Sequence, residues 1–203
     1  MFSLNDAEEV SSYVAALNHG VTRIKNGFPL SLRLLREMHK ILLHNYRGQH
    51  QMPGEFRKSQ NWIGGSRPSN ARFVPPPPDQ LMEVLGDLEN FMHQKDQIHP
   101  LLKAGLLHLQ FETIHPFLDG NGRLGHLLIT IYLWAQEVIY SPFLYLSLYF
   151  KEHRMDYDDA LSAVRSSGDW ETWLIKFLSY GRRNHARGCP KNTMGHSSDV
   201  CGG

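Results

Sequence analysis

Cysteine is nearly absent from this 203-residue chain, which contains only Cys189 and Cys201, both within its last fifteen residues. This placement excludes a disulfide framework for the fold, and two thiols are too few for a cysteine-rich zinc site. The chain also has no His-Glu-x-x-His sequence, and His108 and His115 are seven residues apart, which disfavours a histidine zinc site. A reducing compartment fits this cysteine usage best.

A charge excess of one sign is also missing. Lys and Arg number 21 and Asp and Glu number 20, so the formal net charge is +1 and no bulk field attracts nucleic acid or anionic lipid. The most apolar stretches, residues 127–135 and 142–150, are far shorter than the roughly 20 residues of a membrane span. No secretory signal opens the chain. We therefore expect a cytoplasmic protein that binds neither nucleic acid nor membrane.

Apolar residues are plentiful, at 41% of the chain, and they recur mostly at helical spacing. Helices are expected over residues 6–20, 31–48, 79–92, 100–113, 120–138, 142–150, 154–165 and 169–180. The predicted fold is therefore all-α, a helical bundle of about eight helices. Residues 182–203 are polar and carry no apolar stripe, so they are expected to form a disordered tail behind a single domain over residues 1–181.

One region, residues 55–74, has no helical stripe and ends in four consecutive prolines at 75–78. The apolar segments Asn61–Ile63 and Ala71–Val74 flank a turn-rich stretch, which predicts a small, irregular β-hairpin. Such a hairpin must lean on helices, and its outer edge would be free to accept an extended peptide. The plainer alternative is a surface excursion between two helices.

The segment 115–126, His-Pro-Phe-Leu-Asp-Gly-Asn-Gly-Arg-Leu-Gly-His, links two predicted helices. Gly120 and Gly122 allow a close backbone approach where the loop enters the second helix. Unpaired amides and the positive end of the helix dipole converge there, which predicts a phosphate site. The segment is not a Walker A loop, because it lacks the lysine and the spacing of that motif.

Three side chains of this segment add chemistry to the predicted phosphate site. Asp119 offers a carboxylate of the kind that Mg²⁺ uses when it also holds substrate phosphates. Arg123 adds a planar cation, and His115 could take a proton from an attacking hydroxyl. Each is individually typical of an ordinary loop or turn. Together they indicate phosphoryl or nucleotidyl transfer.

The same segment resembles the signature of the Fic family, His-Pro-Phe-x-Asp/Glu-Gly-Asn-Gly-Arg-x-x-Arg, and residues 115–123 match it throughout. Residues 59–65 and 73–78 look like the hairpin flap of that family. Residues 144–171 are similar to the helices behind its nucleotide pocket. The resemblance covers roughly residues 5–181.

The resemblance implies a Fic fold with a β-hairpin flap and a protein adenylyltransferase, which transfers AMP from ATP to a Ser, Thr or Tyr hydroxyl of a target protein. It makes His115 the general base and Asp119 the Mg²⁺ ligand. The nucleotide-binding residues that it implies are Asp119, Gly120, Asn121, Gly122, Arg123 and His126 in the motif, Ile63, Gly64 and Gly65 in the flap, and Tyr157 and Arg165 toward the adenine. The flap edge would also pair with the target protein.

The chain departs from the family signature at its last position, where His126 replaces an arginine. Arg123 and His126 are three residues apart on a helix, so His126 could still reach the phosphates. An imidazole carries only partial charge near pH 7 and cannot make a forked contact. Open alternatives are therefore a weaker triphosphate grip, transfer of phosphate, UMP or phosphocholine instead of AMP, or a weakly active interaction module.

Control of the activity is a second open point. Many Fic relatives carry an inhibitory Ser/Thr-x-x-x-Glu motif followed by Gly or Asn, and no sequence before Val10 fits it. Ser167 and Glu171 have the spacing, but Thr172 follows and helix capping explains them better. An inhibitory segment or an antitoxin acting in trans is one expectation.

Overall fold

The computed structural model describes residues 4–44, 52–140 and 153–188. Its helices are α1 (Leu4–Lys25), α2 (Leu32–Leu42), the 3-10 turn η2 (Pro68–Asn70), α3 (Leu81–His93), α4 (Pro100–Ile114), α5 (Asn121–Ala135), α7 (Arg154–Ser167) and α8 (Trp170–Gly188). The predicted all-α fold is therefore confirmed. The helix expected over residues 142–150 lies outside the described residues.

Two helix starts follow directly from capping residues in the sequence. The Ser31 hydroxyl accepts a hydrogen bond from the Leu34 amide at 3.3 Å, so Ser31 caps α2 as predicted. Pro100 is the first residue of α4, where its missing N–H costs nothing. Helix starts of this kind depend on neighbouring residues alone.

Several helix ends differ from the prediction, among them that of α2, which ends at Leu42 and not at residue 48. Helix α1 continues to Lys25, because Gly20 is a packing position and not a stop: a Cβ there would collide with the Ile131 side chain of α5. Helix α8 continues to Gly188 and so includes residues 182–188, which the sequence pattern assigns to the tail. Residues 189–203 lie outside the described part of the chain.

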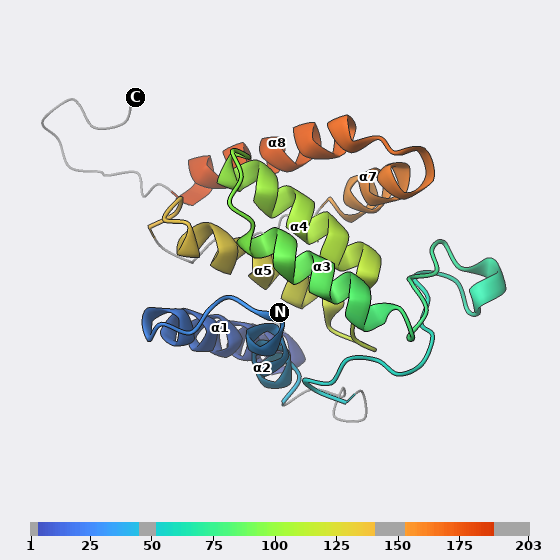
Figure 1. Cartoon of the computed structure of the whole chain (residues 1–203), viewed down its shortest axis with the longest axis horizontal. Coiled ribbons are helices and arrows are strands. Elements are labelled where there is room, and N and C mark those ends of the chain that lie inside the picture. Colours follow the sequence, from blue (N-terminus) through green and yellow to red (C-terminus); the bar gives the residue numbers. More distant parts are fainter. Residues whose placement is uncertain (1–3, 45–51, 141–152, 189–203) are drawn as a thin grey trace, which may run out of the picture.

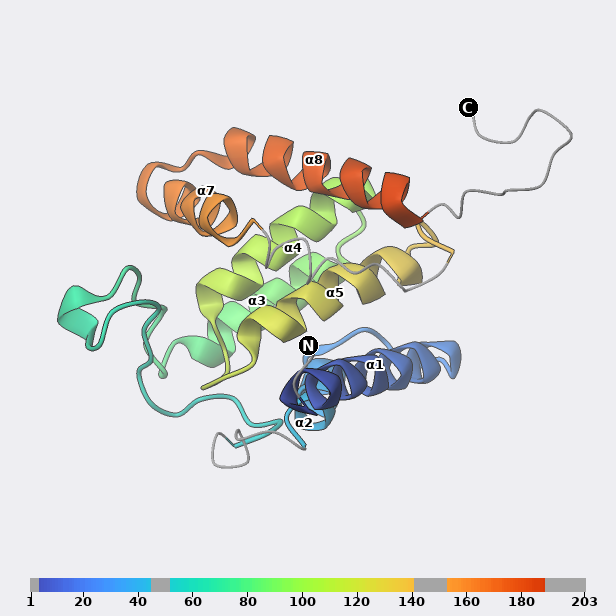
Figure 2. The same cartoon turned by 180° about the vertical axis from the view of Figure 1, so that it is seen from behind.

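Helices α4 and α5 pack side by side at the centre of the molecule (Figures 1 and 2). Helices α1 and α2 pack together and against α5, whereas α3 and α8 pack against α4, and α7 packs against α8. Leu34, Phe111 and Trp173, from α2, α4 and α8, are fully buried in the common core. Within the described residues, no helix has the length and apolar character needed to span a membrane.

The segment between α2 and α3, residues 55–78, projects from the bundle, and we call it the flap segment (Figures 1 and 2). The predicted hairpin is reduced to one antiparallel bridge, in which the Ile63 amide donates to the Phe73 carbonyl at 2.9 Å. Gly64 and Gly65 follow with φ of 69° and 72°, which ends the extended backbone after Ile63. Beyond the bridge, the four prolines at 75–78 have no amide hydrogens with which to continue a ladder.

Candidate active site

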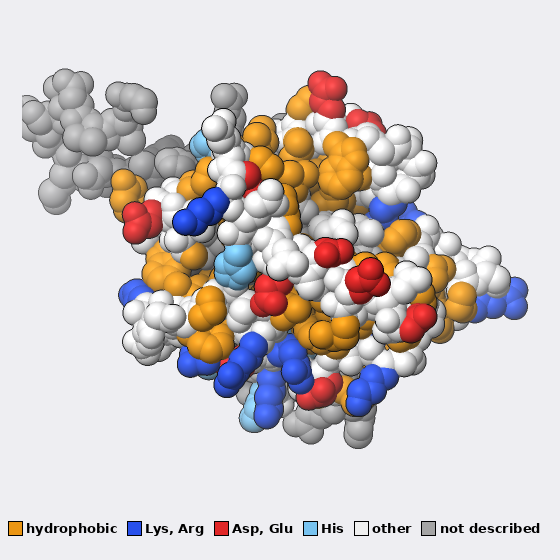
Figure 3. Space-filling view, viewed as in Figure 1, with side chains coloured by type: hydrophobic (Ala, Val, Ile, Leu, Met, Phe, Trp, Pro, Cys, Tyr) orange, Lys and Arg blue, Asp and Glu red, His pale blue; other side chains and the backbone are white. Residues whose placement is uncertain are grey.

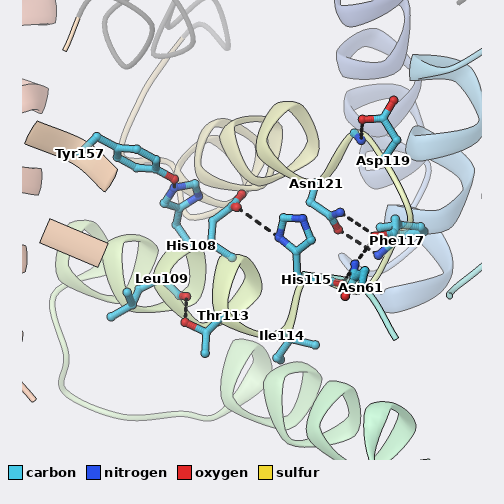
Figure 4. A network of polar contacts seen from close by, with 12 residues as sticks. Asn61, His108, Leu109, Thr113, Ile114, His115, Phe117, Asp119, Asn121 and Tyr157 are labelled. Atoms are coloured by element: carbon cyan, nitrogen blue, oxygen red, sulfur yellow. Dashed lines mark hydrogen bonds and ion pairs between the residues drawn. The ribbon is translucent and has the colours of Figure 1, made fainter. Parts of the chain in front are cut away.

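The loop between α4 and α5, residues 115–120, which we call the histidine loop, begins with a strained residue. His115 has φ 50° and ψ 61°, the left-handed region that non-glycine residues rarely adopt. Its carbonyl accepts hydrogen bonds from Arg57 Nε at 3.0 Å and from Asn61 Nδ2 at 3.3 Å. The backbone of the predicted general base is therefore fixed by residues outside its own loop (Figure 4).

Arg57 is the centre of this anchoring, and its residue surface is only 2% exposed. The guanidinium donates to four backbone carbonyls, those of His115 (3.0 Å), Ser59 (3.3 Å), Ile114 (3.4 Å) and Pro76. These carbonyls belong to the end of α4 and to the flap segment on either side of the bridge. Arg57 thus joins the histidine loop to the base of the flap segment, and no motif in the sequence indicates this role.

His39 of α2 holds the other end of the loop. Its Nδ1 accepts a hydrogen bond from the Gly54 amide at 2.8 Å, so Nε2 must carry the ring proton, which it donates to the Asp119 carbonyl at 2.9 Å. The ring stacks on Phe117 with centroids 3.8 Å apart. Burial lowers the pKa of His39, which keeps the ring neutral in this role.

Gly120 ends the loop next to this histidine. Its φ is 78°, and a Cβ there would lie 3.2 Å from His39 Nε2, so both conformation and space favour glycine. The Asn121 side chain turns back into the loop: Oδ1 accepts from the Phe117 amide at 2.9 Å and Nδ2 donates to the Phe117 carbonyl at 2.8 Å (Figure 4). Only the backbone of Asn121 is therefore available to a ligand.

The N-terminus of α5 lies open beside Asp119. The amides of Asn121, Gly122 and Arg123 precede the first intrahelical hydrogen bond, from Leu124 N to Gly120 O at 3.0 Å. A Cβ on Gly122 would meet nothing within 4 Å, so there is room above this helix end. The position combines the first amides of α5 with the positive end of its dipole, which suits a phosphate.

Asp119 has a carboxylate that is 47% exposed at this helix end, and its Oδ1 accepts from the Gly120 amide at 2.7 Å. Within the described residues, no group of three or more His, Cys, Asp or Glu side chains is arranged to hold a metal ion. A single exposed carboxylate nevertheless fits Mg²⁺, which commonly takes one or two protein carboxylates and completes its shell with phosphates and water.

Arg123 and His126 face different helices. The Arg123 guanidinium lies 3.4 Å from Glu9 of α1 and 3.7 Å from Asp119. The His126 ring instead lies beside His108, with centroids 5.5 Å apart, and beside Tyr157 of α7 at 6.2 Å. Burial of its ring lowers the pKa of His126 well below the ordinary value. His126 is thus a neutral side chain on the α4 and α7 side of α5.

Tyr157 and Arg165 connect α7 to the same region. Tyr157 is nearly buried, and its hydroxyl lies 2.8 Å from His108 Nε2, inside the core (Figure 4). Arg165 donates to the Glu112 carbonyl at 2.9 Å, and its guanidinium lies over the Phe73 ring of the flap segment at 4.2 Å. Both residues therefore lie near the end of α4, on the side that faces α7.

Ile63, Gly64 and Gly65 form the turn of the flap segment. Gly65 requires its missing side chain, because a Cβ would collide with the Asn70 carbonyl. Residues 64–70 are all exposed, and Figure 3 shows basic side chains at the far end of this projection. The structure joins the turn to the histidine loop through Asn61, which hydrogen bonds to the His115 carbonyl two residues before Ile63.

The His115 side chain is 20% exposed, but its Nδ1 atom is buried. Burial lowers the pKa of His115 to about 4; the Glu112 backbone opposes this shift and the nearby cations Arg165 and Arg57 add to it. The ring is therefore neutral at pH 7, which is the state that a general base requires.

These features define a class of protein: an all-helical bundle in which a histidine loop lies beside a helix end suited to a phosphate. The sequence profile of the Fic/DOC family matches residues 29–133, about half of the chain. The chain belongs to the Fic/DOC family, and the resemblance noted from the motif is confirmed.

Named relatives agree with this assignment. Protein adenylyltransferase Fic of Aedes aegypti is 31% identical over 183 residues, which cover 87% of this chain and 33% of that protein. A probable protein adenylyltransferase of Aquifex aeolicus is 30% identical over 132 residues, which cover 65% and 36%. The chain thus spans about a third of the length of these curated relatives.

Solved structures establish the fold independently. A Fic family protein from Desulfovibrio desulfuricans G20 superposes with a TM-score of 0.73 at 23% identity, over 92% of this chain and 54% of that one. Residues 134–508 of Fic-1 from Caenorhabditis elegans superpose with a TM-score of 0.64 at 24% identity, over 92% and 53%.

Proposed function

We propose that this protein is a protein adenylyltransferase that transfers AMP from ATP to a Ser, Thr or Tyr hydroxyl of a target protein. The observation that carries the proposal is the loop itself, which places a neutral imidazole, His115, a few residues before an open helix N-terminus. The names of the relatives from Aedes aegypti and Aquifex aeolicus support AMP as the transferred group.

In the proposed reaction, His115 takes the proton of the target hydroxyl as its oxygen attacks the α-phosphorus of ATP. The bond from this phosphorus to the bridging oxygen of pyrophosphate breaks, and pyrophosphate leaves. The amides of Asn121 and Gly122 and the Arg123 side chain would hold the phosphates. Asp119 would hold Mg²⁺, which when bound neutralises phosphate charge.

The loop amides and Arg123 carry the triphosphate grip in this proposal. His126 replaces the second motif arginine and is buried and neutral, so it adds no positive charge there. The approach of Tyr157 and Arg165 to the adenine remains part of the proposal. The position of Arg165 near the end of α4 supports an approach to the adenine. The support is weaker for Tyr157, because its buried hydroxyl already contacts His108.

The target protein would dock along the flap segment, around Ile63, Gly64 and Gly65. The exposure and projection of residues 64–70 support this placement (Figure 3). A cytoplasmic location and an inhibitory segment or antitoxin supplied in trans belong to the same proposal.

Intact mass spectrometry after incubation with ATP and Mg²⁺ tests the proposal, using the chain itself and added candidate proteins as acceptors. We expect the mass of one adenylate on an acceptor, and no such product with the His115→Ala variant. Label from the γ-phosphate of ATP on protein, with none from the α-phosphate, would instead show phosphate transfer.

A further inference from the structure

Glu112 lies on the last turn of α4, three residues before His115, and its side chain is only 7% exposed. Its Oε2 is 3.8 Å from His115 Nδ1, the contact drawn as a dashed line in Figure 4. Within the described residues, neither Glu112 Oε1 nor His115 Nδ1 has a hydrogen-bond partner, although both are buried. Leaving buried polar groups unpaired is costly. The unpaired Oε1 lies against Gly125 of α5 and Oε2 of the same carboxyl is turned toward Nδ1, so this pair of side chains calls for an explanation.

The fold makes room for this carboxyl group. Gly125 of α5 lies against it, and a Cβ at that position would collide with Glu112 Oε1 and would lie 3.1 Å from His108 Nδ1. The nearby cation does not neutralise the carboxyl by direct contact, because the hydrogen bond from Arg165 goes to the Glu112 backbone carbonyl. The side chain thus occupies a space that α5 leaves free, turned toward the His115 ring.

The surroundings leave the Glu112 carboxyl able to exchange its proton near neutral pH. Burial raises its pKa to about 7, Arg165 opposes this shift and Asp158 adds to it. The titratable and charged groups around the pair are His108 on α4, His126 on α5, Tyr157, Asp158 and Arg165 on α7, Arg57 at the base of the flap segment, and Asp119 in the loop.

We propose that Glu112 is a positioning residue for His115: its carboxylate accepts a hydrogen bond from the Nδ1 N–H and so leaves the Nε2 lone pair free for the incoming hydroxyl. A side-chain rotation that closes the 3.8 Å gap would make this hydrogen bond, and such bonds are often long before substrate binds. The inference rests on the proposed general-base role of His115.

The proposed role also concerns the reaction itself. The hydroxyl proton moves to Nε2, which makes His115 an imidazolium, and Nδ1 keeps its own proton. The Glu112 carboxylate stays ionised and stabilises that positive charge, as the third member of a nucleophile–base–orienter arrangement does. No proton is transferred to Glu112 in this step.

The first test compares Glu112→Gln with wild type in AMP transfer. We expect kcat to fall by about 100-fold at pH 7 with little change in KM for ATP. Wild-type activity should also decline as pH falls through about 7, because Glu112 then takes a proton. That decline should be absent from the glutamine variant, whose low activity should stay level. Glu37→Gln, which removes a half-buried carboxylate between α1 and α2, is the matched control. If Glu112→Gln has the same kcat and the same pH profile as wild type, the proposal is overturned.

The second test needs no activity and separates this inference from the proposed function. Nitrogen-15 NMR of the His115 ring, in wild-type protein without nucleotide at pH 8, should show the proton on Nδ1. A ring protonated on Nε2 would overturn the positioning role, whether or not AMP is transferred and whether or not Glu112→Gln folds. If Glu112→Gln transfers AMP with the wild-type pH profile, only the role of Glu112 is lost and the proposed function stands. If wild-type protein has an Nδ1-protonated His115 ring but transfers no AMP, the proposed function is lost and the contact between Glu112 and His115 stands.

Discussion

The histidine loop and the flap segment are neighbours that are held in different ways. The loop backbone is held by donors far from it in sequence: Arg57 and Asn61, at the base of the flap segment, donate to the His115 carbonyl, and His39 donates to the Asp119 carbonyl. The tip of the flap segment differs: beyond the single bridge between Ile63 and Phe73, its contacts are largely exposed.

The exposed contacts of the flap segment are weak ones. Arg72 pairs with Asp159 and, at 4.0 Å, with Asp158 of α7, and all three side chains are exposed. Exposed ion pairs contribute about 0 to 1 kcal/mol, whereas removing one partner of a buried charged network costs several times more. The comparison indicates that the histidine loop is fixed, and that the segment proposed to meet the target protein can adjust.

Among the variants that test this difference between loop and flap segment, Arg57→Met is expected to have the largest effect. The variant leaves four carbonyls without their buried donor, so the free energy of unfolding should fall by about 3 kcal/mol. Urea denaturation measures it. Arg33→Met, which changes an exposed arginine of α2, should alter the value by less than about 0.5 kcal/mol. If the two variants have equal stability, Arg57 is not the anchor of the loop.

Acid should destabilise the fold through its buried histidines. Burial lowers the pKa of His39, and that of His108 to about 4, below the unfolded value of 6.5. Unfolding therefore takes up protons below pH 6.5, and stability falls as pH drops from 6.5 to 4, by up to about 3 kcal/mol for His108. Glu112 acts in the opposite direction, since its raised pKa costs stability as pH rises from 4.5 to about 7.

Thermal unfolding followed between pH 4 and pH 8 measures this dependence. In His108→Gln the fall in stability toward pH 4 should be shallower than in wild type. His93→Gln, at the exposed end of α3, is the control. The same acid dependence in His108→Gln and wild type would contradict the assignment.

A smaller effect is expected from Arg72→Ala, because it removes only the exposed ion pairs between the flap segment and α7. Global stability should change by less than about 1 kcal/mol. Proteolytic cleavage within residues 64–70 should become severalfold faster, which mass mapping of the fragments measures. The control is Arg154→Ala, which removes a different partner of Asp158, at 3.7 Å, from within α7. Equal cleavage rates for both variants would mean that Arg72 does not hold the flap segment.

The smallest effect is expected from Glu9→Gln. Glu9 lies 3.4 Å from the Arg123 guanidinium and is half exposed, so it competes only weakly with phosphates for that cation. ATP affinity in the presence of Mg²⁺, measured by calorimetry, should rise about two- to fivefold. Glu8→Gln, an exposed neighbour on α1, should have no effect. Weaker ATP binding in Glu9→Gln would contradict this reading of the contact.

Most of the fold and the motif loop could be predicted from the sequence because their causes are local. Ser31 caps α2 through an amide three residues away, Pro100 starts α4, and the whole histidine loop is one continuous segment. The end of α1 could not be predicted, because Gly20 is set by its contact with Ile131, more than a hundred residues away.

The residues that anchor the loop could not be predicted for the same reason. Arg57 and His39 act on carbonyls 58 and 80 residues away in sequence, and a lone buried arginine or histidine has no local pattern. Glu112 is three residues from His115, but its orientation toward the ring depends on the space that Gly125 leaves on α5. The hairpin was expected from its composition, and two left-handed glycines limit it to one bridge.

The central claim is that the loop before α5 holds the phosphates of a nucleotide beside His115. A crystal structure of the chain grown with Mg²⁺ and a non-hydrolysable ATP analogue tests it most directly. We expect phosphate oxygens within hydrogen-bond distance of the Asn121 and Gly122 amides, with the α-phosphorus facing His115. Nucleotide bound elsewhere on the molecule, with this helix end left to solvent, would contradict the account.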